Sequence, residues 1–455
     1  MTIATELELA PSHPTLGEAT AVWARIGLLS FGGPAGQIAL MHKELVEERR
    51  WIAEGRFLHA LNFCMLLPGP EAQQLATYIG WLLHGTKGGV IAGVLFVLPG
   101  FIVIMALSAL YAAFHETSWL ASLFFGLKAA VLAIVIEAVI RVGRRAIRNR
   151  VMLTIAIVAF LALFAFNVPF PVVVLLAGLV GYVGTRANPA IFAPAGHRAA
   201  AMDHPSVIGA GFVAGHPSSV RMTGTVAAWL ALWIAPLVLI VPALGWGSTF
   251  AVLLTFFSQM AVVTFGGAYA VLAYVAQEAA QNFGWLQPGE MVDGLALAET
   301  TPGPLVMVLS FVGFLAAYRD PGGLSPMLAG LLGGALTTWV TFVPCFLWIF
   351  LGAPYVEGLR SNKALSGALS AITAAVVGVI LNLAIWFGLH VIFRDVGVLH
   401  AGPVTIASPD WGSINWIAVG LCLVAVACLF RLRLGILRTL AICGGLGLLV
   451  LLLPV

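Results

Sequence analysis

Two Pro-Gly-Pro tripeptides lie within apolar sequence and are the residues best suited to form a ligand site. They are Pro68-Gly69-Pro70 and Pro302-Gly303-Pro304. An α-helix ends at such a tripeptide, because proline lacks an amide donor and forces the preceding residue out of the helical region. The last proline of each tripeptide then suits the first position of a new helix. Because the free amides at a helix start favour an anion, we expect both tripeptides to bind substrate.

Two Phe-Gly-Gly motifs predict a second pair of helix breaks. The glycines are Gly32 and Gly33 in the first motif, and Gly266 and Gly267 in the second. Each helix start carries roughly +0.5 of a charge, so four converging starts would give about +2, which matches a dianion. The alternative is that these glycines and prolines only permit tight packing.

Polar side chains near the first pair of breaks complete the predicted substrate site. Arg25 lies in an apolar stretch seven residues before Gly32. A cation at membrane depth marks a functional site by default. Glu71 and Gln74 follow the first Pro-Gly-Pro tripeptide. The equivalent of Arg25 in the second motif pair is the neutral Gln259, so we expect the first half to make more substrate contacts.

Three carboxylates are candidates for carrying protons, because burial favours their neutral form. They are Glu71, Glu137 and Glu299. The alternative role of Glu71 is to complement the positive end of a helix. The alternative for Glu137 is an ion pair with Arg141, one helical turn further on. Glu299 has no such partner nearby in sequence, and we favour it as the proton site.

The composition predicts an integral membrane protein. The chain has 455 residues, of which 61% are hydrophobic and 9% are charged, against about 25% charged residues in soluble domains. No clustered basic face indicates nucleic-acid binding. The sequence lacks an ATPase phosphate loop, a His-Glu-x-x-His motif and a nucleophile or metal-ligand spacing. We therefore expect no catalytic residue, metal or cofactor, which disfavours the alternative class of a membrane-embedded enzyme.

The chain contains a tandem repeat. An offset of 234 residues aligns the two Phe-Gly-Gly motifs, Trp51 with Trp285, and the two Pro-Gly-Pro tripeptides. The predicted organisation is an N-terminal tail at 1–15, a first repeat at 16–186, a cytoplasmic loop at 187–222, a linking span at 223–247 and a second repeat at 248–455.

The expected fold is an all-α polytopic membrane protein with about nine spans plus four shorter broken segments. A helix needs about 20 apolar residues to cross a bilayer. The predicted spans lie near 86–114, 120–141, 151–167, 170–186, 223–245, 325–352, 364–393, 413–430 and 439–453.

The distribution of basic residues favours inverted repeats. The basic segments 41–56 and 141–150 are both predicted to be cytoplasmic. They lie on the same side only if the first Pro-Gly-Pro segment, roughly 57–83, dips into the membrane and returns. Five spans then separate the two re-entrant segments, which inverts the second repeat. The alternative is that both broken segments cross fully.

Several motifs together resemble the chromate ion transporter family. In the first half they are Ser30 to Ala35, Val46 to Trp51 and Leu66 to Ala72. Thr264 to Tyr269 and Thr301 to Pro304 are similar to the other half of that family. The resemblance implies chromate efflux across the bacterial cytoplasmic membrane, exchanged against protons and conferring chromate resistance.

Two alternatives for the function stay open. Chromate is a tetrahedral dianion close to sulfate in shape, so sulfate or another oxyanion is an alternative substrate. A passive anion channel is the alternative to a secondary active transporter. The expected partners are the oxyanion and the lipid bilayer, and a homodimer is an alternative to a monomer.

Overall fold

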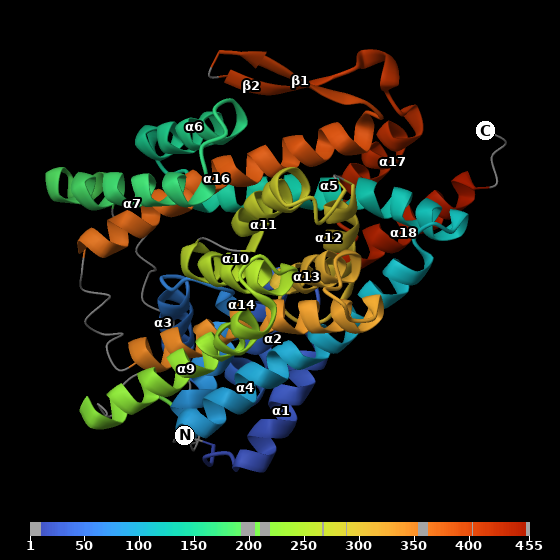
Figure 1. The fold of residues 1–455 in the computed structure, drawn as a ribbon. Helices are drawn as coiled ribbons and strands as arrows, with labels where there is room; N and C mark the ends of the chain where they lie inside the picture. The colour runs from blue at the N-terminus through green and yellow to red at the C-terminus, as the bar shows by residue number, and fades with distance from the viewer. Residues whose placement is uncertain are drawn as a thin grey trace, which may run out of the picture.

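The computed structural model describes residues 11–192, 205–209, 219–265, 268–287, 289–353, 363–402 and 404–451. Helices make up most of this part of the chain (Figure 1). In the first half they are α1 (Leu16–Leu29), α2 (Gly33–His42), α3 (Glu54–Cys64), α4 (Glu71–Phe114), α5 (Ser118–Ala146), α6 (Arg150–Phe164), α7 (Phe170–Ala187) and α8 (Pro189–Phe192). The remaining helices are α9 (Ser219–Leu244), α10 (Thr249–Val263), α11 (Ala268–Gln277), α12 (Glu290–Thr300), α13 (Val308–Arg319), α14 (Pro326–Gly352), α16 (Lys363–Ile392), α17 (Trp416–Val426) and α18 (Ile436–Val450).

The two halves repeat the same order of elements. The helices α1 to α5 correspond to α10, α11, α12, α13 with α14, and α16. A π-helical turn follows both α2 and α11, at Lys43–Glu48 and Glu278–Asn282. Since even these short irregular turns recur, the elements agree with the tandem repeat that the sequence predicts.

The helix boundaries follow the local chemistry of the chain. The hydroxyl of Thr15 accepts a hydrogen bond from the Glu18 amide, and the Glu18 carboxylate accepts one in return from the Thr15 amide, which fixes the start of α1. At the starts of α6, α10 and α17, a single side-chain oxygen accepts a hydrogen bond from an amide in the first turn. These side chains are Asn149, Ser248 and Asn415.

A kink divides α4 at His84 and Gly85. Gly85 has a φ of +62°, in the left-handed region, and His84 also departs from helical geometry. The part of α4 before the kink corresponds to the end of the broken segment predicted at 57–83. The longer part after it corresponds to the predicted span 86–114.

The described residues are helical, as the sequence predicts, apart from a small β-hairpin that the sequence analysis did not predict. Strand β1 (Val396–Ala401) pairs antiparallel with β2 (Val404–Pro409), with Val396 opposite Pro409. The Thr405 amide donates a hydrogen bond to the Ala165 carbonyl, which ties the hairpin to the end of α6. The connection after α16 is thus ordered structure, because its unpaired backbone groups find partners in a second strand.

Six helices in the described residues are long and apolar enough to cross a bilayer. They are α4, α5, α7, α9 (from Met222), α14 and α16. The helices at the predicted spans 151–167, 413–430 and 439–453 are shorter than a perpendicular crossing needs, since α6 and α18 have 15 residues each. The protein is a multi-pass membrane protein.

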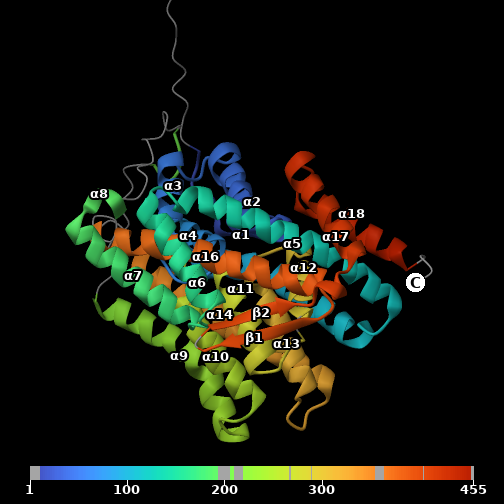
Figure 2. The same ribbon diagram turned by 90° about the horizontal axis from the view of Figure 1, so that it is seen from above.

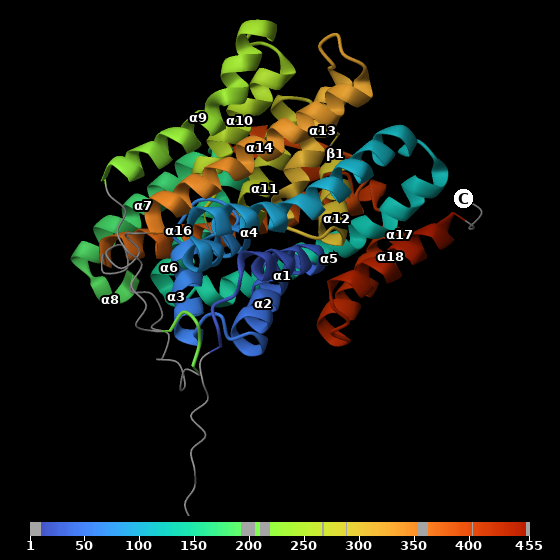
Figure 3. The ribbon, with the colours of Figure 1, turned by 90° about the horizontal axis from the view of Figure 1, so that it is seen from below.

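The two halves interlock through their long helices. The helix α14 packs on α4, α10 and α13, while α16 packs on α5, α6 and α7. Small residues permit this close approach of the helices, since a Cβ on Gly93 would lie 2.5 Å from the Phe346 ring and one on Gly334 would lie 2.6 Å from Met105 Sδ. The α9–α10 and α13–α14 turns lie at one end of the molecule, and α2, α3 and the start of α18 lie at the other (Figures 2 and 3).

Candidate anion-binding site

Each Pro-Gly-Pro tripeptide separates two helical segments, as the sequence predicts. The first lies between α3 and α4, and the second lies between α12 and the 3₁₀ turn Leu305–Met307 that precedes α13. The central glycines have a φ of +116° at Gly69 and +89° at Gly303. Glycine adopts this left-handed region without the steric cost that other residues meet, so the breaks depend on it.

The amide of each central glycine is satisfied by the other half of the chain. The Gly69 amide donates to the Thr264 carbonyl at 2.8 Å, and the Gly303 amide donates to the Ser30 carbonyl at 2.8 Å. Ser30 and Thr264 are equivalent residues of the two Phe-Gly-Gly segments. A buried unpaired amide is costly in an apolar interior. Each half therefore completes the break of the other.

Close packing also joins each break to the opposite half. A Cβ on Gly100 would lie 2.3 Å from the Pro302 carbonyl oxygen, and one on Gly69 would lie 2.7 Å from Cys345 Sγ. Gly100 and Cys345 each follow a proline inside a long helix, at Pro99 and Pro344. The two tripeptides are thus held by equivalent surfaces.

Two buried glutamines hold carbonyl groups of the breaks. The Gln37 amide group donates to the Gly303 carbonyl at 2.5 Å, and the Gln74 amide group donates to the Pro68 carbonyl at 2.7 Å. The side-chain oxygens of both glutamines are buried without a hydrogen-bond partner among the described residues. The sequence identifies Gln74 but not Gln37, which lies on α2. Valine stands at both equivalent positions of the second half.

The first Phe-Gly-Gly motif forms an open helix start. Gly32 and Gly33 have φ values of +85° and +70°, and α2 begins at Gly33. A Cβ on either glycine would meet no described atom within 4 Å. The second pair, Gly266 and Gly267, lies outside the described residues. The expected convergence of four helix starts therefore stays a prediction.

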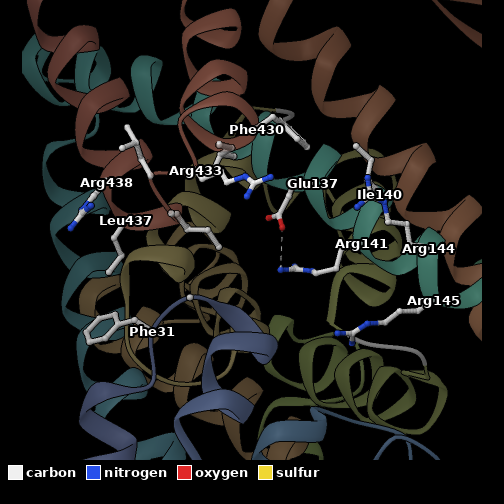
Figure 4. Close-up of a pocket in the computed structure, with 15 residues that line it drawn as sticks. Phe31, Glu137, Ile140, Arg141, Arg144, Arg145, Phe430, Arg433, Leu437 and Arg438 are labelled. Carbon is white, nitrogen blue, oxygen red and sulfur yellow. Dashed lines mark hydrogen bonds and ion pairs between the residues drawn. The ribbon is translucent and has the colours of Figure 1, made fainter. Parts of the chain in front are cut away.

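The open start of α2 borders a strongly basic cavity of about 940 Å³ (Figure 4). We call it the arginine cavity. Phe31 and Gly32 form one wall, and the end of α5 and the segment before and into α18 form the others. Its charged lining residues are Arg141, Arg144, Arg145, Arg433, Arg438 and Glu137. Five arginines and one glutamate give a formal charge of +4, so the cavity attracts anions.

Two of the predicted carboxylates lie within the field of these arginines. The charges of Arg145 and Arg141 act on Glu71, at the start of α4. Arg141 also acts on Glu299, at the end of α12. Arg141 therefore contributes positive potential at both Glu71 and Glu299, although 228 positions separate these residues in the sequence. Pro70 and Pro304 stand next to the helix starts that follow each break.

Glu137 makes the ion pair that is its alternative role. Arg141 Nη1 lies 3.5 Å from Glu137 Oε1, and both side chains are half-buried (Figure 4). Glu299 is only 2% exposed, and Tyr269 donates a hydrogen bond to its Oε1 at 2.6 Å. The other oxygen, Oε2, is buried without a partner in the described part of the chain. A proton on this oxygen would remove the buried negative charge of Glu299.

Arg25 lies away from the arginine cavity. Its Nε is 3.3 Å from Glu44 Oε1, and its side chain is 56% exposed. Glu44 is buried and also pairs with Arg49 at 3.5 Å. The predicted substrate role of Arg25 remains a prediction, since the structure places this cation against a carboxylate rather than at Gly32.

Sequence reasoning missed the arginines that line the cavity. It assigned Arg144 and Arg145 to a cytoplasmic segment, and it gave no substrate role to these two residues or to Arg433 and Arg438. One signal was present, because Arg141, Arg144 and Arg145 have the spacing that places side chains on one face of a helix. The approach of α18 to α5 is a long-range contact that no local pattern shows.

The fold and the site define a class: a polytopic membrane protein with two similar halves and a basic cavity beside a helix break. A family model described as chromate transporter matches residues 17–182 and 251–448. The chain belongs to the chromate transporter family, which is a family of transporters and not of enzymes.

Three relatives resemble the chain over most of its length. The chromate transport protein of Pseudomonas aeruginosa is 35% identical over 377 residues, which cover 82% of this chain and 81% of that protein. The chromate transport protein of Cupriavidus metallidurans is 28% identical over 84% of this chain and 85% of its own length. The probable chromate transport protein of Synechococcus elongatus is 26% identical, with coverages of 83% and 86%. No solved structure matches the chain.

The substitution Gly100→Ala tests the packing of the second break. The added Cβ would meet the Pro302 carbonyl, so we expect the free energy of unfolding to fall by about 1–3 kcal/mol, as in other overpacked sites. Thermal melting of the purified protein measures this. The matched control is Gly420→Ala on α17, where a Cβ meets no described atom within 4 Å. Equal melting temperatures for the two variants would contradict the packing.

Proposed function

We propose that this protein exports chromate across the bacterial cytoplasmic membrane in exchange for protons, and thereby confers chromate resistance. The named activity of the relatives indicates the substrate. The arginine cavity beside Gly32 is the observation that carries the proposal. Its charge suits a doubly negative oxyanion.

Arginine suits this substrate for geometric reasons. A guanidinium group stays charged and offers donors in a planar fork that matches the oxygens of an oxyanion. The cavity of about 940 Å³ is many times the ~30 Å³ that one water occupies in the liquid. It therefore holds the anion with part of its hydration shell and acts as a vestibule. The amides at the start of α2 provide the tighter contact.

The proposal includes an inverted arrangement of the two halves. The reciprocal bonds of Gly69 to Thr264 and Gly303 to Ser30 are the pattern of a two-fold axis, in which each partner contributes the same groups. An axis in the membrane plane makes the broken pairs approach from opposite faces, as in other transporters with inverted repeats. The Pro-Gly-Pro segments then re-enter the membrane and meet near its middle.

Proton exchange is assigned to Glu299, and Glu71 is the second candidate carboxylate in the field of Arg141. Arg141 supplies the positive charge near both carboxylates. A chromate ion that binds the arginines partly cancels this charge, and its departure restores it. Because a neighbouring charge controls protonation, anion binding at the arginines favours the protonated form of Glu299. Exchange then requires that this proton enters from the face opposite the one from which the anion binds.

Chromate flux in everted membrane vesicles tests the function. We expect uphill chromate accumulation that a protonophore abolishes, because the pH gradient supplies the driving force. A passive channel would instead give only downhill flux that the protonophore does not affect, and this result would overturn the proposal. Sulfate added in excess distinguishes the substrates. Full inhibition together with sulfate accumulation would make sulfate the substrate.

The substitution Arg145→Gln tests the role of the arginine cavity. A hydrogen bond to a charged group is worth about 1.5–3 kcal/mol, so we expect chromate transport to fall by about tenfold or more. The control is Arg431→Gln, at a nearby cation that lies outside the lining formed by the described residues. Vesicle flux at matched protein amounts measures both variants. Equal loss in both, or in neither, would argue against substrate binding in the cavity.

A further inference from the structure

A second buried charged cluster centres on Asp293, near the start of α12. Tyr111 of α4 donates a hydrogen bond to Asp293 Oδ2 at 2.9 Å, and Lys128 Nζ of α5 lies 3.3 Å from the same oxygen. Asp293 is 3% exposed. Three helices from both halves of the chain therefore meet at one carboxylate.

The second oxygen of Asp293 is unsatisfied. Oδ1 is buried and has no hydrogen-bond partner among the residues that the structure describes. Glu290, one turn earlier on α12, differs. Arg319 binds both of its oxygens, at 2.6 and 2.8 Å, and the Gln287 amide adds a third hydrogen bond. Glu290 is a saturated structural ion pair, whereas Asp293 keeps one oxygen free for a proton.

The ionisable groups on the other described elements around Asp293 do not pair with its free oxygen. Besides α4 and α5, the elements that pack on α12 are α13, α18 and the turn Leu305–Met307. Arg319 of α13 is bound to Glu290. Arg438 of α18 lines the arginine cavity, and the turn Leu305–Met307 carries no ionisable side chain. Cys443 of α18 has its backbone against Gly126.

The Asp293 cluster lies far from the arginine cavity. Lys128 and Arg141 are 13 residues apart on α5, which is about 20 Å along a helix. Lys128 lies toward the α4–α5 turn, which Figures 2 and 3 place on the side of the α13–α14 turn, away from α2. His115 at this turn is exposed and stacks on Tyr111, with ring centroids 5.7 Å apart. An exposed, titratable side chain therefore stands directly next to the cluster at this end.

Exchange requires the proton and the anion to reach the protein from opposite faces. Glu71 and Glu299 lie within the field of Arg141, on the cavity side. An anion in the arginine cavity would favour protonation of these carboxylates from the same face, unless another group supplies the proton from the far face. Asp293 is on the same helix as Glu299 and accepts a hydrogen bond from Tyr111, which stacks on the exposed His115 at that far face.

We propose that Asp293, held between Lys128 and Tyr111, is the carboxylate at which protons bind from the face opposite the arginine cavity. This inference rests on the proton exchange of the proposed function. The proton passes from water to a carboxylate oxygen of Asp293, and the ion pair with Lys128 is lost. When the proton leaves, the Asp293 carboxylate forms the ion pair with Lys128 again. The ion pair thus forms and breaks once in each cycle.

Infrared spectroscopy of the reconstituted full-length protein tests proton binding directly. We expect the difference spectrum between acidic and alkaline buffer to contain a buried carboxyl band that Asp293→Asn removes. Glu290→Gln should keep this band, because its carboxylate is already saturated by Arg319. An unchanged spectrum in Asp293→Asn would overturn the proposal. If that variant does not insert, Tyr111→Phe replaces it, and an unshifted carboxyl band would overturn the proposal equally.

Transport in vesicles tests the role in exchange. We expect Asp293→Asn to keep chromate counterflow at equal pH within about twofold, and to lose pH-driven accumulation by about tenfold or more, the size of typical coupling between sites. A variant that keeps pH-driven accumulation would overturn this proposal alone. Wild-type vesicles that transport chromate without moving protons would overturn both the exchange and the role of Asp293.

Discussion

The structure depends on the need to pair every backbone amide in an apolar interior. Proline and glycine open both breaks, and this leaves the Gly69 and Gly303 amides without a helical partner. Thr264 and Ser30 of the opposite halves supply the acceptors. Their hydroxyl groups donate to carbonyls one turn back, at Met260 and Ile26, and so satisfy the helix ends at which they stand. Because neither half closes its own break, each Pro-Gly-Pro segment must lie against the Phe-Gly-Gly segment of the opposite half.

The symmetry of the backbone contrasts with the asymmetry of the side chains. Gln37 and Gln74 belong to the first half and have valine equivalents in the second. The acidic residues Glu290, Asp293 and Glu299 all lie on α12 of the second half. We infer that duplication fixed the shared framework, and that the polar side chains then diverged between the halves. The long helix α5 reaches both sites, with Arg141 at one and Lys128 at the other.

Local sequence patterns predict the breaks and the helices well, because proline geometry and apolar length are local properties. The Pro-Gly-Pro breaks, the repeat and the positions of the long spans all agree with the structure. Contacts between distant segments were not predictable in this way. Nothing local pairs Gly303 with Ser30, draws α18 to the arginines of α5, or sets Lys128 against Asp293. The ion pair of Arg25 with Glu44 is a further contact that no local pattern predicts, since Glu44 lies on a neighbouring segment.

The amide-to-carbonyl contact between the halves can be measured by solid-state NMR in lipid. Glycine labelled with ¹⁵N and threonine labelled with ¹³C at the carbonyl report on Gly69 and Thr264. An N to O distance of 2.8 Å and a carbonyl bond of about 1.2 Å limit the N to C distance to about 4 Å. We predict a dipolar contact at this distance that disappears in Thr264→Ser, which keeps the hydroxyl but removes the label. A difference spectrum between the two proteins that lacks this contact would contradict the reciprocal closure of the breaks.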